Sequence, residues 1–167
     1  MLSQSKRMIV RAILVTAAAA VIAGSTAAVA SAGMTMTVGS PTLSGKVLIT
    51  VPMTLTCSPF DPSLTFFSAS ASVQVEQAVG QQIATGFGSV GGFMGGTQLA
   101  FNCDNSPQSV PVLVQANTSG PPFHGGPASF RIFAGAAAGI PCGFLGCFTN
   151  VVVQNASLGP TILNMRG

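Results

Sequence analysis

Apolar and polar side chains alternate along most of this chain, and the alternation constrains the fold more than any other feature. The clearest example is 67–76, where every odd position is Phe, Ala or Val and every even position is Ser, Gln or Glu. Because successive side chains of a β-strand point to opposite faces, a period of two predicts strands with one buried and one solvated face. Further predicted strands are 47–57, 99–103, 110–114, 130–134, 151–153 and 161–163, with weaker candidates at 34–38 and 82–88.

Turn-forming residues separate these runs at 58–63, 104–107, 117–122 and 125–127. Seven to nine short strands at this spacing, without a long helical period, predict an all-β fold, an antiparallel Ig-like β-sandwich. Two segments are expected to depart from this pattern. The Ala-rich segment 134–139 is expected to form at most a short helical turn, and the Gly-rich segment 86–96 a mobile or sharply bent hairpin connection.

Residues 1–32 have the three parts of a secretory signal peptide: a basic start, an apolar stretch and a run of small residues. Small residues occupy the positions that signal peptidase requires, which predicts cleavage after Ala32 or after Ala30. The alternative is a retained membrane anchor, since the apolar run is long enough to span a bilayer. We expect a cleaved signal-peptide helix at 1–32 and one domain at 33–167, which is secreted or held at the cell surface.

The net positive charge of the chain lies in the signal segment. Residues 33–167 carry three basic and three acidic side chains: Lys46, Arg131, Arg166, Asp61, Glu76 and Asp104. Nucleic-acid binding requires clustered Lys and Arg, so no nucleic-acid partner is expected. The only membrane contact that we expect is through an uncleaved signal segment.

Four cysteines follow the signal segment, and an even number in a small exported domain predicts two disulfides. Of the three possible pairings, we favour Cys142 with Cys147, because they flank a short Gly-containing loop. Cys57 and Cys103 then remain, and both end alternating runs on the inward phase, so they are expected to meet across two sheets. Metal binding by the four thiols is the competing interpretation, but it lacks a Cys-x-x-Cys pair.

Few side chains are suited to catalysis. His124 is the only imidazole and could act as a general base with Asp104 or Glu76, but we favour a loop histidine without a catalytic role. Asp61 and Asp104 lie in turns, where Asp commonly caps the backbone. We therefore predict no catalytic residues, no metal site and no cofactor.

The chain combines a signal segment, an alternating domain rich in Thr, Ser and Val, an inward cysteine pair, and the segments Val-Gln-Val-Glu-Gln (73–77) and Pro-Pro-Phe-His-Gly-Gly-Pro-Ala (121–128). With these features it resembles uncharacterised small secreted proteins of actinobacteria, which are thought to be Ig-like. More remotely it resembles the enediyne-binding apoproteins, small secreted sandwiches with two disulfides. Cys142 and Cys147 match the short disulfide loop of that family in spacing, whereas Cys57 and Cys103 are farther apart than its first pair.

These observations predict a non-enzymatic exported domain that binds a partner or forms part of the extracellular layer. The partner is a cell-wall polymer, another extracellular protein or a second copy. One alternative is a carrier of a hydrophobic small molecule, and another is a hydrolase that uses His124. The residues expected to contact a ligand or partner are Phe87, Phe93, Met94, Phe144 and Phe148. The Phe side chains among them are expected either to remain partly exposed or to fold back onto the ends of the sandwich.

Overall fold

The computed structural model describes residues 27–31, 33–92, 99–142 and 147–167, and these residues form strands and connections without a helix. The predicted all-β fold is thereby confirmed. Of the signal-peptide helix predicted at 1–32, residues 27–31 form a strand instead of a helix, and residues 1–26 and 32 lie outside the described residues. No helix with the length and apolarity needed to cross a membrane occurs in the described ranges. The strands are β1 (Ala27–Ser31), β2 (Met34–Val38), β3 (Thr42–Ser44), β4 (Leu48–Cys57), β5 (Phe66–Val79), β6 (Gln82–Gly92), β7 (Gln108–Ala116), β8 (Gly126–Pro141) and β9 (Phe148–Met165).

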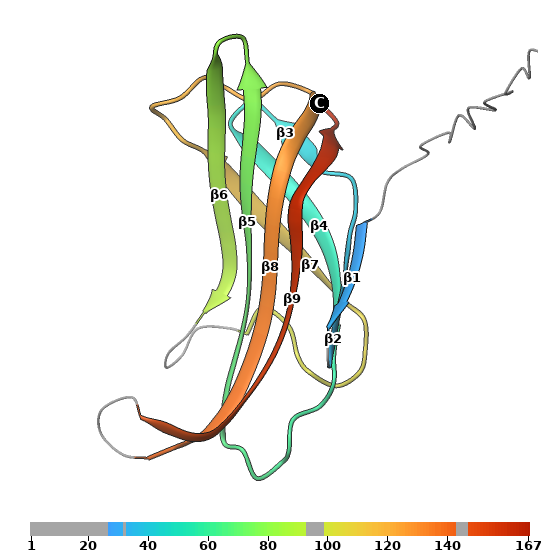
Figure 1. Cartoon of the computed structure of the whole chain (residues 1–167), viewed down its shortest axis with the longest axis vertical. Coiled ribbons are helices and arrows are strands. Elements are labelled where there is room, and N and C mark those ends of the chain that lie inside the picture. Colours follow the sequence, from blue (N-terminus) through green and yellow to red (C-terminus); the bar gives the residue numbers. More distant parts are fainter. Residues whose placement is uncertain (1–26, 32, 93–98, 143–146) are drawn as a thin grey trace, which may run out of the picture.

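The strands form one antiparallel sheet in the order β1-β2-β4-β7-β6-β5-β8-β9, and β3 pairs with the free part of β4 (Figure 1). The pairing of β6 with β7 is short, because only Gly86 with Ala116 and Phe87 with Gln115 are in register. The sheet therefore consists of two halves, β1 to β4 with β7, and β6-β5-β8-β9, which join at this short contact.

The two outer edges of the sheet also approach one another, so that the sheet nearly closes. At one end, the Leu43 N–H donates to the Arg166 carbonyl at 2.7 Å, and the Arg166 N–H donates to the Pro41 carbonyl at 3.0 Å. At the other end, the Gln154 amide bonds both the N–H and the carbonyl of Ser58, at 3.1 and 2.8 Å. Gln154 is a buried polar residue, and these two hydrogen bonds offset the cost of removing its amide from water.

The core lies between the two halves and follows the predicted alternation. β2, β4, β5 and β7 bury every second residue, and β8 does so over most of its length. Three predicted inward positions are nevertheless exposed, because Val47 precedes β4, Phe67 lies at the open end of β5, and Leu99 lies in the connection from β6 to β7. The largest fully buried side chains are Phe123, Phe130, Met34, Met36, Ile49, Met53 and Leu55.

Three local predictions are wrong. Residues 99–103 are not a strand; the chain crosses there from β6 to β7, and the side chain of Gln108 bonds both backbone groups of Asn102. Residues 134–139 form no helical turn, because β8 is paired with β5 on one side and β9 on the other. Runs 151–153 and 161–163 belong to the single strand β9 rather than to two strands.

The Gly-rich connection predicted at 86–96 begins as a strand, because β6 continues to Gly92. A side-chain carbon at Gly88 would overlap the Leu113 carbonyl, so glycine lets β6 pass close to β7. Glycine at position 88 is therefore needed because the two strands lie close together, and not because the chain bends there. Residues 93–96 lie outside the described residues.

Candidate binding surface

His124 lies exposed in the connection before β8. Its backbone N–H donates to the Gln77 Oε1 at 2.9 Å, and its carbonyl accepts from the Gln77 Nε2 at 2.9 Å. Gln77 is buried on β5, so this pair of bonds fastens the connection to the sheet. The backbone of His124 thus has a clear structural role in holding the connection.

Two of the three carboxylates cap turns, as predicted. Asp61 Oδ1 accepts the Ser63 N–H at 2.8 Å, and this bond lowers the pKa of Asp61. Asp104 Oδ1 accepts the Ser106 hydroxyl and the Ser106 N–H, and these bonds lower the pKa of Asp104. Glu76 lies exposed on β5. A lowered pKa keeps a carboxyl ionised, whereas a general acid needs a raised one.

The structure forms both disulfides with the predicted pairing. Cys57 and Cys103 have Cα atoms 4.7 Å apart, and those of Cys142 and Cys147 are 5.3 Å apart. The first bond does not cross between two sheets as expected, because Cys103 lies in the connection to β7, the neighbour of β4. The second bond joins the end of β8 to the start of β9. Among the described residues, no three His, Cys, Asp or Glu side chains are grouped to hold a metal ion.

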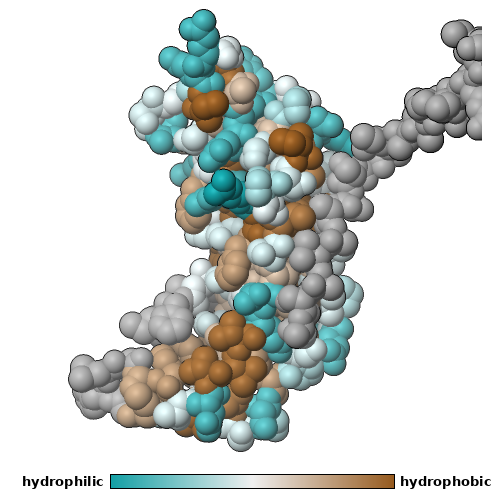
Figure 2. All heavy atoms as spheres, in the orientation of Figure 1, coloured by the Kyte–Doolittle hydropathy of each residue, from teal (hydrophilic) through white to brown (hydrophobic). Residues whose placement is uncertain are grey.

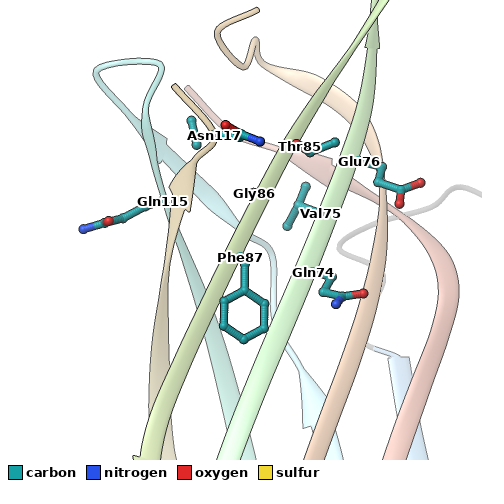
Figure 3. Close-up of a pocket in the computed structure, with 9 residues that line it drawn as sticks. Gln74, Val75, Glu76, Thr85, Gly86, Phe87, Gln115 and Asn117 are labelled. Carbon is teal, nitrogen blue, oxygen red and sulfur yellow. The ribbon is translucent and has the colours of Figure 1, made fainter. Parts of the chain in front are cut away.

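Phe87 and Phe148 lie far apart. Phe87 is 54% exposed at a hollow of about 510 Å³ where β6 meets β7, with Gln74 and Gln115 nearby (Figure 3). Phe148 is half-buried, and its ring centroid lies 4.4 Å from that of Phe66. Gln74 pairs with Phe87, and Gln74 lies eight positions after Phe66 on β5, a span of about 26 Å. These two side chains therefore line no common cleft; Phe93, Met94 and Phe144 lie outside the described residues.

An apolar pocket of about 280 Å³ opens at the end of the sheet where β4 finishes and β5 begins. The rings of Phe60 and Phe67 stand 6.1 Å apart there, and Phe101 forms a buried wall. The described residues that line it are Pro59, Phe60, Phe67, Ser68, Ala69, Leu99, Phe101, Asn102, Cys103 and Ala136. This pocket was not predicted from the sequence, although Phe67 and Phe101 fall on the inward phases of their runs.

The hairpin of β8 and β9 curves away from the other strands beside this pocket (Figure 1). Val151, Val152 and Val153 are 53%, 47% and 58% exposed. Because consecutive strand residues point to opposite faces, both faces of the hairpin are open to solvent here. No charged residue occurs between Arg131 and Arg166.

The pocket and the hairpin lie at the same end of the molecule. Phe67 pairs with Ala138 on β8, and Ala138 pairs with Val152 on β9, so Phe67 and Val152 lie on the same, inner face of the sheet. Val151 and Val153 point to the opposite face of the hairpin. Brown, hydrophobic side chains gather over this lower end of the molecule in Figure 2. We call it the apolar end, and it comprises Phe60, Phe67, Leu99 and Val152 together with Val151 and Val153 on the other face.

Comparison of the chain with protein-family models, with curated proteins and with solved structures found no match.

Proposed function

We propose that this chain is an exported, non-enzymatic domain that binds another extracellular protein, or a second copy of itself, through the apolar end. The observation that carries the proposal is the uncharged end of the molecule, where the pocket and Val152 on one face and Val151 and Val153 on the other are all exposed to solvent. Contiguous exposed apolar surface is a common feature of protein contact sites. A wall polymer rich in hydroxyl groups would leave these valines without apolar partners, so we favour a protein partner.

Export is supported by the two disulfides, which form and persist in oxidising compartments. The non-enzymatic part of the proposal is supported by the use of Asp61 and Asp104 as turn caps. Neither carboxyl has the raised pKa of a general acid.

The fold that we propose is an Ig-like sandwich of the two halves. When β2, β4, β5, β6, β7, β8 and β9 are named A, B, C, C′, E, F and G, the halves have the orders A-B-E and C′-C-F-G. Immunoglobulin-type sandwiches place A, B and E in one sheet and C, F and G in the other. The Cys57–Cys103 bond departs from antibody domains, whose disulfide joins strands B and F.

The double substitution Val151→Thr, Val153→Thr tests the apolar end. Threonine keeps the β-branched shape, and both positions are exposed, so the fold is expected to be retained. We expect association, measured by sedimentation and by retention at the cell surface, to weaken about tenfold, because two apolar contacts are lost.

Ile162→Thr is the matched control, because Ile162 is 64% exposed on the same strand but far from the apolar end. It should associate like the parent protein. Equal association of the parent, the double variant and the control would contradict the proposal.

The second candidate is a carrier of a hydrophobic small molecule, and the pocket of about 280 Å³ favours it. An apolar cavity of about 150 Å³ holds benzene, so this pocket has room for a larger ring system.

We expect the probe 8-anilinonaphthalene-1-sulfonate to bind in this pocket. In the variant Phe67→Ala its affinity should fall about tenfold, which corresponds to about 1.4 kcal/mol of binding free energy. Phe133→Ala is the control, since Phe133 is 46% exposed against 45% for Phe67 and lies outside the pocket. Equal dye binding by both variants would reject the carrier.

A further inference from the structure

Strand β1 occupies a gap at the edge of the sheet. All five of its residues pair antiparallel with β2, from Ala27 opposite Val38 to Ser31 opposite Met34. On its other side β1 lies alongside β9 (Figure 1). We call the space that β1 fills between β2 and β9 the β1 slot.

The β1 slot is closed at both ends. Beyond one end, backbone hydrogen bonds join Arg166, just after β9, to Pro41 and Leu43. Beyond the other, the Gln154 side chain of β9 bonds both backbone groups of Ser58. Because β9 is held to the opposite half of the sheet at these two points, the slot accommodates a single strand and not the edge of another sheet.

The strand in the slot belongs to the segment that the sequence marks as a signal peptide. Cleavage after Ala32 would remove all of β1, and cleavage after Ala30 would leave only Ser31. β2 would then become an edge strand with the sequence Met-Thr-Met-Thr-Val. Natural edge strands are commonly shielded by charged residues or proline, and β2 contains neither.

We infer that signal cleavage opens the β1 slot and that the exported protein receives there one extended segment of another polypeptide, antiparallel to β2. This inference rests on the export in the proposed function and on the signal cleavage that the sequence predicts. The strand seated in the slot, Ala-Ala-Val-Ala-Ser, indicates the chemistry of the occupant: small, uncharged side chains, none larger than valine. Backbone hydrogen bonds supply the attraction in this mode of recognition, and side-chain size limits the choice of segment.

Amide hydrogen exchange of 33–39 in the processed protein from the culture medium tests the inference, after intact mass has located its first residue. The probe is the capped peptide Ala-Ala-Val-Ala-Ser, added at about 1 mM and above so that even a weak complex forms. We expect the outward amides of β2 to exchange at least tenfold more slowly with the peptide present. The control peptide has proline in place of valine. Because proline lacks the backbone N–H that a strand donates to its neighbour, this peptide should not protect the β2 amides.

Protection by the first peptide and not by the second supports the inference. No protection at saturating peptide would overturn it, as would β2 amides that are already protected in a dimer without peptide. A mature chain that starts at or before Ala27 would also overturn it, because β1 would then remain in its slot. That outcome leaves the export of the domain and its apolar end intact, so the two proposals fail separately.

Discussion

Joint replacement of Cys57 and Cys103 by alanine is expected to lower the free energy of unfolding by about 4 kcal/mol. The bond closes a loop with a sequence separation of 46, and on the chain-entropy model a longer loop restricts the unfolded chain more. Cys57 is buried and Cys103 borders the apolar pocket, so alanine avoids placing a hydroxyl in the core. Denaturant unfolding with linear extrapolation measures the change.

Joint replacement of Cys142 and Cys147 by alanine is the matched comparison. This bond has a sequence separation of only 5, and both cysteines are exposed, so the expected loss is about 2 kcal/mol. A loss as large as that for the Cys57–Cys103 pair would contradict the loop-length argument. It would mean that the hairpin of β8 and β9 contributes more to folding than its exposure indicates.

Gly88→Ala is expected to lower the free energy of unfolding by about 3 kcal/mol, because it forces β6 and β7 apart. The added carbon would overlap the Leu113 carbonyl and lie 2.9 Å from the Val114 Cα, and neither backbone atom can move aside easily. Gly86 and Phe87, just before this position, make the only register pairs between the two strands. Thermal or denaturant unfolding measures the loss.

Gly120→Ala serves as the control for the glycine experiment. A carbon added there would find its nearest neighbour, the Ile83 carbonyl, at 3.5 Å, an ordinary contact. We expect its stability to stay within about 0.5 kcal/mol of the parent. If the two alanine variants were equally stable, the close approach of β6 to β7 would not be the reason for glycine at position 88.

The sequence predicted those strands whose alternation is long and whose inner face is covered. Alternation over 67–76 corresponds to β5, and the inner residues from Ala69 to Val75 are buried. Alternation over 99–103 did not give a strand. Runs of the same length at 34–38 and 110–114 do lie in strands, but this one has to carry the chain from one half of the sheet to the other.

Prediction of the Ala-rich and Gly-rich segments failed for another reason. Segment 134–139 has a composition that permits a helical turn, but pairing with strands on both sides overrides local preference. The glycines of 86–96 predict a mobile or sharply bent hairpin connection, whereas Gly88 is needed because another strand passes close by. Such close approaches depend on the tertiary fold and leave no local signal beyond the glycine itself.

The apolar end was not predicted from the sequence. The predicted contact residues are Phe and Met side chains near glycine-rich segments, and of these Phe87 is exposed but lies at the hollow where β6 meets β7. The pocket instead gathers Phe60, Phe67 and Phe101 from three segments, of which the third is joined to the end of β4 through the Cys57–Cys103 bond. Their proximity could be recognised only after the disulfide and the order of the strands were known.

Export followed by association through the apolar end can be measured by native mass spectrometry of the protein recovered from the culture medium. We expect a processed chain with both disulfides formed, present in part as a complex with a protein partner or a second copy. The complex should decline in Val151→Thr, Val153→Thr and persist in Ile162→Thr. A chain that still begins at Met1 with free thiols, or a processed monomer without a complex in the parent and both variants, would contradict the account.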